Sequence, residues 1–414
     1  MFILYNLLMT LLAPFWLPWM YWRTRQRAEP VNWKERAGEY TIPKRGEKRR
    51  IWVHAVSVGE VLASTPVLRA IREELPNHEI VLSVTTSSGH QTAREKAADL
   101  FDHLIYFPID IPRFTLRAIQ SVRPDVVAIM ETELWFNFLW AAQTFDARTI
   151  LVNGRISDRN IKRSKYLVFF YKSLLKQLDR TLMQTKADAD RITFLGAQNA
   201  EVIGNCKFDQ AAEGLDADPE KWRRELKLEP GRPVVVVGSL RAEEFEFLAA
   251  TIKAVPEPHW IVAPRHLEKT PGLIEAIGGP VASRTEKTTG DVIVLDTYGE
   301  LANVYSTADV VVVGGGFGKW GGQNPIQPLA QGKPILFGPY MQNFRDAAAM
   351  AVEAGAGQVC ASPEELALAI KELLNDPKKR KEIGDNARRL VDQNVGASRR
   401  YAKVIAEETA KVKD

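Results

Sequence analysis

The chain has 414 residues, of which 45% are hydrophobic, and this is enough to bury the cores of about two domains. The 55 Lys and Arg residues exceed the 51 Asp and Glu residues by a formal net charge of only +4, which argues against a nucleic-acid-binding protein. Two cysteines, Cys206 and Cys360, exclude a disulfide framework and a cysteine-rich zinc site, and the six histidines show no metal-ligand spacing.

The N-terminal segment, residues 1–22, carries no charged side chain, and three arginines follow it by Arg27. As a helix it would be about 33 Å long, which is enough to cross a hydrocarbon core. Pro14 and Pro18 interrupt it, and its Trp and Tyr residues suit a membrane interface. We therefore expect residues 1–30 to form a membrane anchor, with the main body on the cytoplasmic side. Spanning the bilayer, burial in one leaflet and packing on the protein's own core are the alternatives.

From Ile51 onward, short β-branched runs alternate with helical patterns, which is typical of a parallel, doubly wound sheet. Polar residues after position 210 predict a domain boundary there. We expect two α/β domains that face each other across a cleft, residues 31–210 and 211–395, and a C-terminal helix in residues 396–414. The expected strands are 51–53, 79–85, 103–107, 126–131, 149–152, 180–184 and 201–203 in the first domain and 234–237, 260–263, 291–295, 310–313 and 334–337 in the second.

Acidic residues follow two strands of the first domain. Ser57 and Glu60 begin a helix at the rim where open α/β sheets bind ligands, although their spacing is also that of a capping box. In the functional interpretation, helix-start amides keep Glu60 ionised, so that it accepts a proton from an attacking hydroxyl. Glu131 and Glu133 follow a hydrophobic run and are poorly explained by core packing, with a solvated loop acid as the alternative for each.

Basic and hydroxyl residues follow other strands. Arg155 belongs to a basic cluster that suits lipid phosphates beside a membrane anchor, unless the cluster is simply a solvated face. Ser239 and Arg265 directly follow strands of the second domain. A hydroxyl and a forked guanidinium both bind phosphate, so these residues indicate a nucleotide pocket.

The stretch 314–338 crowds glycines between a β-branched run and an expected helix. A phosphate can approach the backbone closely where no Cβ intrudes, and amides at a helix start face the anion. We interpret this stretch as the floor of the nucleotide pocket, with tight strand-to-helix packing as the alternative. The further rim positions are Gly299, Glu300, Leu301, Asn324, Pro325, Ile326 and Gln327.

Seven motifs then point to one family. They read HAVSVGE at 54–60, METELW at 130–135, NGRISDR at 153–159, GNCKFD at 204–209, APRH at 263–266, GGQNPIQP at 321–328 and GPYMQNFRD at 338–346. Together they resemble the 3-deoxy-D-manno-octulosonic acid (Kdo) transferases over nearly the whole chain.

The resemblance implies two Rossmann-like domains of the GT-B glycosyltransferase architecture. It also implies transfer of Kdo from CMP-Kdo to the lipid A precursor (lipid IVA) in lipopolysaccharide biosynthesis, at the cytoplasmic face of the inner membrane. By family pattern Glu60 is the general base, and Glu131 and Lys207 assist the transition state. The implied CMP contacts are Pro264 and Arg265, Gly299–Leu301 and Asn324–Gln327.

CMP-Kdo, the lipid A precursor and the inner membrane surface are thus the expected partners, and no cofactor, metal or nucleic acid is expected. The sequence leaves the oligomeric state and the number of transferred Kdo residues open. Three positions depart from the family pattern. Gln323 replaces a histidine, Gln327 replaces a glutamate whose charge suits a ribose hydroxyl, and Leu240 replaces a hydroxyl residue.

Two other functions remain open from the sequence. A nucleotide-sugar epimerase shares the two-domain architecture, but an epimerase does not need the N-terminal anchor or the basic clusters. A membrane-tethered nucleotide-sugar binding protein without turnover is motivated by Gln323 and Gln327.

Overall fold

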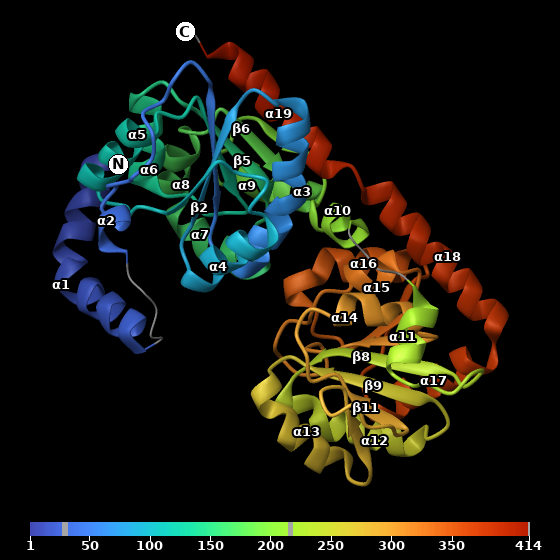
Figure 1. Cartoon of the computed structure of the whole chain (residues 1–414). Coiled ribbons are helices and arrows are strands. Elements are labelled where there is room, and N and C mark those ends of the chain that lie inside the picture. Colours follow the sequence, from blue (N-terminus) through green and yellow to red (C-terminus); the bar gives the residue numbers. More distant parts are fainter. Residues whose placement is uncertain (27–31, 214–217, 413–414) are drawn as a thin grey trace. The chain divides into compact units, whose positions relative to one another are not determined.

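The computed structural model describes residues 1–26, 32–213 and 218–412, so Arg27 and the boundary expected at residue 30 lie outside the described residues. The chain divides into two compact units, Met1–Gln210 with Gly396–Asp414, and Ala211–Val395 (Figure 1). Each unit is built on a seven-stranded sheet, and in each sheet the paired strands are parallel. The expected pair of Rossmann-like α/β domains is therefore confirmed.

The sheet of the first unit has the order β3-β2-β1-β4-β5-β6-β7. Its strands are β1 (Arg50–Ala55), β2 (Glu79–Val84), β3 (His103–Tyr106), β4 (Val126–Met130), β5 (Arg148–Gly154), β6 (Arg180–Met183) and β7 (Ala200–Val202). The central strands β1 and β4 are buried along their whole length because helices cover both of their faces.

Helices of the first unit pack in two layers. They are α1 (Phe2–Gln26), α2 (Trp33–Arg36), α3 (Val58–Glu74), α4 (Ser87–Lys96), α5 (Pro112–Val122), α6 (Phe136–Thr144), α7 (Asp158–Ser164), the 3₁₀ helix η1 (Lys165–Leu167), α8 (Val168–Leu175), α9 (Lys186–Phe194), α10 (Lys207–Ala212) and α19 (Ala397–Lys411). Apolar residues of α3, α4 and α19 pack on one face of the sheet, and those of α5, α6, α8 and α9 pack on the other.

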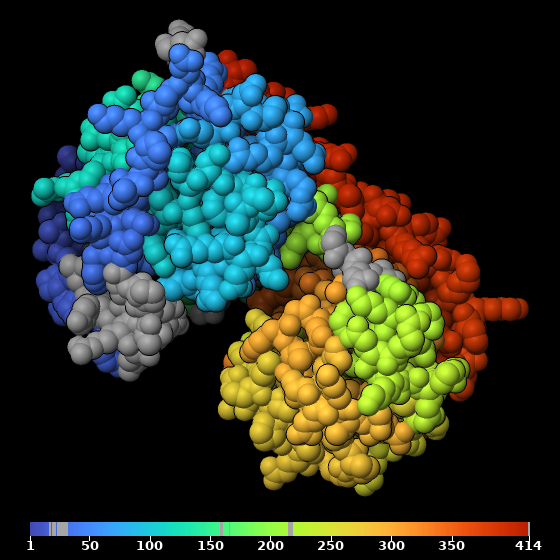
Figure 2. All heavy atoms as spheres, in the orientation of Figure 1, coloured from blue at the N-terminus to red at the C-terminus, as the bar shows by residue number. Residues whose placement is uncertain are grey.

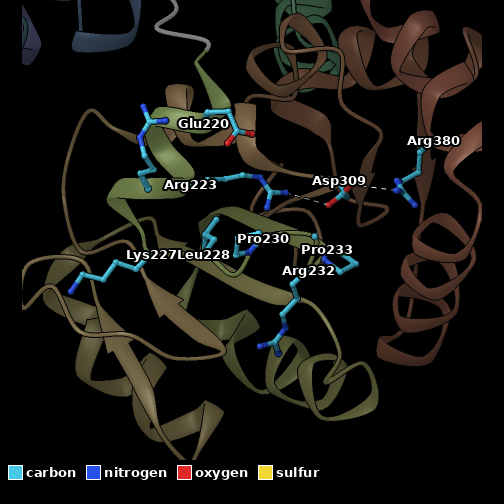
Figure 3. A pocket seen from close by; sticks show the side chains of 11 residues that line it. Glu220, Arg223, Lys227, Leu228, Pro230, Arg232, Pro233, Asp309 and Arg380 are labelled. Atoms are coloured by element: carbon cyan, nitrogen blue, oxygen red, sulfur yellow. Dashed lines mark ion pairs between the residues drawn. The ribbon is translucent and has the colours of Figure 1, made fainter.

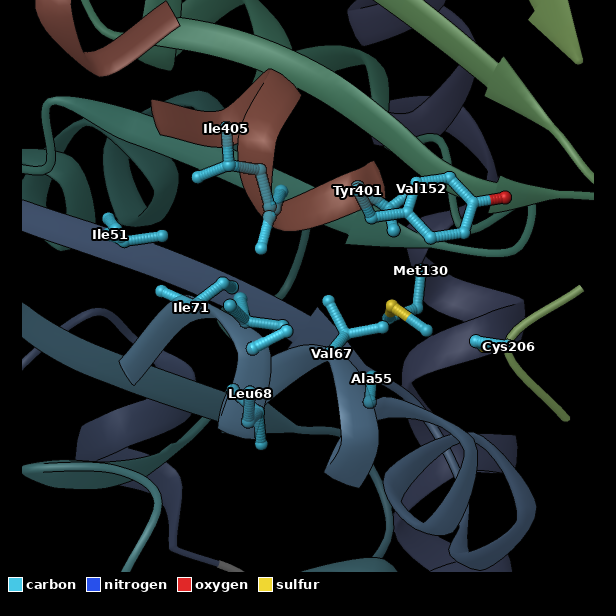
Figure 4. Packing of buried hydrophobic residues seen from close by; sticks show 14 of the residues in the cluster. Ile51, Ala55, Val67, Leu68, Ile71, Met130, Val152, Cys206, Tyr401 and Ile405 are labelled. Carbon is cyan, nitrogen blue, oxygen red and sulfur yellow. The ribbon is translucent and has the colours of Figure 1, made fainter. Parts of the chain in front are cut away.

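The C-terminal helix α19 is part of the first unit, and its side chains gather with those of α3 over one face of the sheet (Figure 4). Tyr401 and Ile405 are fully buried there. Asp209 fixes the start of the helix, because its carboxylate accepts hydrogen bonds from the backbone N–H groups of Gly396 and Ser398. The chain thus returns to the first unit after the second is complete.

One face of α1 packs on the first unit. Tyr5 donates a hydrogen bond to Asp110 (2.8 Å), Asn6 pairs with Asn137 (2.8 Å), and the ring of Phe2 lies 4.4 Å from that of Trp140. The neighbouring apolar side chains are exposed. They are Ile3, Leu4, Leu7, Leu8, Leu11, Leu12 and Phe15.

No helix of the described residues is long and apolar enough to cross a membrane. The described residues therefore give no support to the membrane-anchor helix expected from the sequence. Polar Asn6 and Thr10 interrupt the apolar run, and Tyr5 and Asn6 are committed to partners in the domain. The alternative of packing on the protein's own core holds for one face of the helix only.

The sheet of the second unit has the order β10-β11-β9-β8-β12-β13-β14. Its strands are β8 (Val234–Leu240), β9 (His259–Pro264), β10 (Val281–Ser283), β11 (Val292–Val294), β12 (Val310–Val313), β13 (Ile335–Phe337) and β14 (Gly357–Val359). Valine-rich β8 and β12 lie side by side at its centre and are buried.

Helices and 3₁₀ helices surround this sheet, and Figure 2 shows the segment of α11 (yellow-green) at the surface of the unit. They are α11 (Pro219–Glu225), η2 (Ala242–Glu244), α12 (Phe245–Ala254), η3 (Leu267–Lys269), α13 (Thr270–Ile277), α14 (Leu301–Val304), η4 (Tyr305–Thr307), α15 (Ile326–Ala330), η5 (Gln342–Phe344), α16 (Arg345–Glu353), α17 (Pro363–Asn375) and α18 (Pro377–Asn394). Side chains of α12, α13 and α17 form the main core with the sheet.

Candidate active site

The candidate residues of the first unit follow strands that end at the same edge of its sheet. β1 pairs with β4 so that His54 lies opposite Ile129, and β4 pairs with β5 so that Met130 lies opposite Val152. The loops after these three parallel strands therefore start side by side. Two of these loops carry Glu131 and Arg155, and the third leads into α3, whose first turn carries Glu60; the sequence placed all three residues at this rim.

Glu60 lies in the first turn of α3 and is partly buried. Its carboxylate accepts a hydrogen bond from the backbone N–H of Val56 (2.8 Å) and one from the hydroxyl of Ser57 (3.2 Å). Ser57 makes no side-chain capping bond to the helix, so the capping box that its spacing suggested does not form. The Ser57 hydroxyl instead orients the Glu60 carboxylate.

The pKa of Glu60 is raised from 4.5 to about 7. Burial is the main cause, and the neighbouring charges of Glu131 and Glu133 add to it, while the bonds from Val56 and Ser57 oppose it. The expectation that helix-start amides hold Glu60 ionised is therefore wrong in sign, because burial outweighs them. A carboxylate with a pKa near 7 is a better general base at neutral pH than an ordinary one.

Glu131 forms an ion pair with Lys207, with 2.8 Å between Oε1 and Nζ. Glu131 has a left-handed backbone (φ +56°), a conformation that strains a non-glycine residue and is frequent at functional sites. Lys207 begins α10, so the pair joins the end of β4 to the start of that helix. These two residues and Glu60 belong to one site, since Glu131 contributes to the pKa of Glu60.

Asn153 supports this site and was missed as a functional residue in the sequence. It is fully buried at the end of β5, and its side-chain oxygen accepts a hydrogen bond from the backbone N–H of Cys206 (3.2 Å). This bond holds the residue just before Lys207. Its backbone is also left-handed (φ +54°), and the Asn-Gly pair in the sequence is the one signal that pointed to such a conformation.

Arg155 is half-buried just beyond β5, and its backbone oxygen accepts a hydrogen bond from the Thr132 hydroxyl (3.0 Å). This bond ties the loop after β4 to the loop after β5. His54, in the same motif as Glu60, is fully buried and stacks on Phe107. Burial lowers the pKa of His54 to about 3, so this histidine is neutral and packs in the core.

The candidate donor residues of the second unit also follow adjacent strands. β8 pairs with β12 so that Gly238 lies opposite Val313, and with β9 so that Leu240 lies opposite Pro264. Ser239, Arg265 and the glycine-rich stretch therefore start at the same edge of this sheet. Ser239 is left-handed (φ +55°), and Arg265 is exposed.

Glu244 organises the glycine-rich stretch from outside it. This fully buried carboxylate accepts hydrogen bonds from the backbone N–H groups of Gly315 (2.7 Å), Phe317 (2.9 Å) and Arg241 (3.0 Å). Amides that we expected to face a phosphate are thus bonded to the protein's own carboxylate. The α-helix that follows β12, α15, begins at Ile326, within this stretch.

Close packing explains two glycines at this edge. A Cβ on Gly238 would lie 1.8 Å from the Tyr305 hydroxyl, and one on Gly338 would lie 2.1 Å from the backbone oxygen of Gly316. The alternative of tight packing therefore holds for these positions. The groups available to a nucleotide are those at the rim of the sheet, beyond the amides that bind Glu244.

The other rim residues lie in two loops. Glu300 pairs with Arg284 (3.0 Å), so its side chain is committed within the unit and its loop offers mainly backbone groups from Gly299 to Leu301. Asn324 accepts a hydrogen bond from the backbone N–H of Ile326 (3.0 Å) and so starts α15. Gln327 follows in the first turn of that helix and is half-buried.

Trp320 is a second residue that the sequence analysis missed. It is 47% exposed in the glycine-rich stretch, and the Arg241 guanidinium lies 4.9 Å from the centre of its ring. Within the described ranges, no group of three or more His, Cys, Asp and Glu side chains is placed to hold a metal ion.

Comparison with known families supports the resemblance. Residues 31–210 match the family model described as 3-deoxy-D-manno-octulosonic-acid transferase (kdotransferase), and residues 287–390 match glycosyl transferases group 1. The 3-deoxy-D-manno-octulosonic acid transferase of Bordetella pertussis is 32% identical over 97% of this chain and 98% of its own length. That of Chlamydia muridarum is 30% identical over 89% of this chain and 87% of its own length.

A bifunctional glycosyltransferase/methyltransferase of Fusobacterium nucleatum is 30% identical over 95% of this chain, which spans 62% of that protein. Among solved structures, a UDP-N-acetylglucosamine 2-epimerase from Listeria monocytogenes has a TM-score of 0.61 at 14% identity and covers 87% of this chain and 95% of its own. MurG from Acinetobacter baumannii has a TM-score of 0.56 at 13% identity, with 87% and 100% covered. At such low identity these structures show the shared two-domain fold alone.

The Bordetella protein matches over nearly the whole of both chains and the Chlamydia protein over most of both, and Glu60, Glu131 and Lys207 lie in the motifs of the resemblance. The chain belongs to the 3-deoxy-D-manno-octulosonic acid transferase family of glycosyltransferases.

Proposed function

We propose that this glycosyltransferase moves Kdo from CMP-Kdo to a sugar hydroxyl of the lipid A precursor, lipid IVA, in lipopolysaccharide biosynthesis. The observation that carries the mechanism is Glu60, a partly buried carboxylate with a pKa near 7, oriented by Val56 and Ser57. The named activity of the full-length relatives supports the transferred sugar.

In the proposed reaction the Glu60 carboxylate takes the proton of the acceptor hydroxyl. The acceptor oxygen forms a bond to the anomeric carbon of Kdo, and the bond between that carbon and the phosphate oxygen breaks, so CMP departs with the electron pair. Attack on the face opposite the leaving group inverts the anomeric centre. The Glu131–Lys207 pair lies beside the base and fixes charge near the reacting atoms.

The second unit holds the donor in this proposal. Arg265 and the Ser239 hydroxyl meet the phosphate, and the loops at Gly299–Leu301 and Asn324–Gln327 meet the cytidine. Arg265 is exposed at the carboxyl edge of the sheet, where open α/β folds bind nucleotides. Gln327 accepts a ribose hydrogen bond through its neutral amide oxygen. The reaction needs neither metal nor cofactor.

We also propose that the exposed face of α1 lies in the cytoplasmic leaflet of the inner membrane. Ile3, Leu7, Leu11 and Phe15 are 81%, 55%, 64% and 75% exposed and recur at helical spacing. Such a face gains free energy when it enters the lipid interface, while the other face of α1 stays bound to the domain. Arg155 and its basic neighbours then lie on a unit that is held at an anionic lipid surface.

The test is transfer of Kdo from CMP-Kdo to lipid IVA, followed by mass analysis of the lipid. Glu60→Gln removes the base while keeping the size of the side chain, and we expect kcat to fall by about 10²-fold to 10⁴-fold. Glu73→Gln is the matched control, because Glu73 lies on the same helix and is exposed. Wild-type turnover by a folded Glu60→Gln protein contradicts the assignment of the base.

A further inference from the structure

The second unit carries a pocket at the edge of its sheet opposite to the candidate donor residues. It has a volume of about 470 Å³ and lies where β8 and β12 begin, beside Pro233 and Asp309. The helix α11 and the start of α18 supply its other walls. None of the motifs that define the family falls in this pocket.

The lining of the pocket is strongly basic. Five Lys and Arg side chains line it against two carboxylates, Glu220 and Asp309. Arg223 and Arg380 lie on either side of Asp309 (Figure 3), with nitrogen-to-oxygen distances of 4.0 Å and 3.4 Å. Both distances exceed the 2.7–2.9 Å of a charge-assisted hydrogen bond, so Asp309 orients the two guanidinium groups without fully pairing them.

Other contacts hold these groups in place before any ligand arrives. Arg380 donates two hydrogen bonds of 2.7 Å to the backbone oxygens of Leu373 and Leu374, so its position is fixed at the end of α17. Asp309 accepts a hydrogen bond from the backbone N–H of Val234 (2.9 Å). Arg380 is thus preorganised, and a preorganised arginine binds an anion at a lower entropic cost than a flexible side chain does.

The remaining charges of the pocket divide between local partners and solvent. Arg232 pairs with Asp291, and Lys227 donates to the backbone oxygen of Lys287, so both point away from Arg223 and Arg380 in Figure 3. Arg224 is exposed at the rim. The pKa of Lys333 is lowered to about 8, mainly by burial, while Asp309 raises it and Arg388 and Arg223 lower it.

We propose that this pocket binds a phosphate-bearing anion, held by Arg223 and Arg380 with Arg224 at the rim. Two guanidinium groups supply forked donors for phosphate oxygens, and both lie beside Asp309. The phosphate belongs to a small soluble anion or to a lipid headgroup, which share this chemistry. The site is separate from the donor residues and does not depend on the proposed reaction.

The test uses the full-length protein saturated with CMP, so that the candidate donor site is already filled, and inorganic pyrophosphate as the probe in calorimetry. We expect saturable binding that weakens with salt, and about a ten-fold or greater loss of affinity in Arg223→Gln/Arg380→Gln. Arg399→Gln is the matched control, because Arg399 is exposed on α19, outside the pocket. Arg224→Gln leaves the Asp309 pairs intact and should weaken binding by a smaller factor.

A variant that keeps both charges, Arg223→Lys/Arg380→Lys, should retain part of the affinity and so separates loss of the site from loss of folding. Binding to phosphatidylcholine vesicles with and without phosphatidylglycerol distinguishes the two sources. Headgroup dependence that disappears in the double glutamine variant supports a lipid, and binding of pyrophosphate alone supports a soluble anion. Equal pyrophosphate affinity in wild type, the double glutamine variant and the control overturns the proposal, whatever the Kdo transfer activity.

Discussion

At the scale of single residues, the candidate site depends on one carboxylate whose proton affinity the sequence could not predict. The position of Glu60 follows from the strand-to-helix pattern, because the residue after a parallel strand lies at the rim of the sheet. Its pKa depends on how deeply it is buried and on the charges of Glu131 and Glu133, which lie just after β4, some 70 residues later in the chain. A local sequence pattern predicts neither the depth of burial nor which distant charges lie near the carboxylate.

The raised pKa predicts how activity depends on pH. Glu60 must be ionised to accept a proton, so kcat/KM should fall about ten-fold per pH unit below the pKa of about 7 and level off above it. Glu133→Gln removes one neighbouring negative charge and should move the midpoint to lower pH. Glu73→Gln, on the exposed side of α3, should leave it unchanged. A profile that is flat from pH 5 to 8 is incompatible with Glu60 as the base.

The same shift has a cost in stability. Because the folded-state pKa lies above the ordinary value of 4.5, the folded protein binds the Glu60 proton more tightly than the unfolded chain does. The contribution of Glu60 is therefore complete at low pH and declines as pH rises through this range. Burial of Glu60 thus gives a base that is effective near neutral pH, but it lowers the free energy of unfolding at that pH.

At the scale of elements, the glycine-rich stretch shows that a sequence motif does not predict which group its backbone amides bind. The sequence placed it correctly after a buried strand, at the edge that carries the other rim residues. It could not show that Glu244, some 70 residues earlier, occupies the amides of Gly315 and Phe317. A backbone N–H group can donate its hydrogen bond to a protein carboxylate or to a bound phosphate. Only the folded structure shows which of these acceptors it has.

Glu244 therefore positions the donor loops, and its loss should appear in donor binding. With Glu244→Gln, at least one of the amides of Gly315 and Phe317 loses its acceptor, and we expect CMP affinity to fall about ten-fold. Neighbouring Glu243 is exposed, so Glu243→Gln should bind CMP as the wild type does. Calorimetric titration with CMP compares the two, and equal affinities argue against a positioning role.

The packing of α19 gives a second prediction for an element. Glu408 is fully buried and accepts hydrogen bonds from Arg148 (2.7 and 2.9 Å) and Arg180 (3.2 Å). Burial raises the pKa of Glu408, but the hydrogen bonds from Lys411, Arg148 and Arg180 lower it by more. The pKa is therefore lowered overall, and Glu408 stays ionised. Glu408→Gln should lower the free energy of unfolding by about 1–3 kcal/mol.

The adjacent acid provides the control for this measurement. Glu407 is 60% exposed and lies 3.5 Å from Arg180, so Glu407→Gln should cost about 0.5 kcal/mol or less. Thermal unfolding of the two variants under identical conditions makes the comparison. A Glu408→Gln protein as stable as Glu407→Gln shows that the buried pairs contribute little net stability.

At the scale of the whole molecule, most of the architecture was predictable. Long valine- and isoleucine-rich runs such as 126–131 and 310–313 identified the central strands, because parallel strands are buried on both faces. The edge strands β10 and β14 were missed, because their sequences, Val-Ala-Ser and Gly-Gln-Val, form no continuous apolar run. The apolar N-terminus predicted a hydrophobic helix, but not which of its faces packs on the domain.

The two faces of α1 lead to a prediction for the whole protein. Leu7→Asp/Leu11→Asp places charges on the exposed face, and we expect co-sedimentation with lipid vesicles to fall several-fold while the fold is retained. Thr10→Asp adds a charge at a polar, exposed position of the same helix and should have a smaller effect. Equal sedimentation of all three proteins would exclude α1 as the lipid-contacting element.

The chain returns to the first unit at Gly396, so this unit is completed only after the second unit has been translated. Tyr401 and Ile405 fill the core between α3 and the first sheet, yet they leave the ribosome after the whole of the second unit. The part of the first sheet that α19 covers is therefore exposed until the second unit has been translated. A nascent chain stopped before residue 396 lacks α19 and leaves its apolar partners on α3 and the first sheet uncovered.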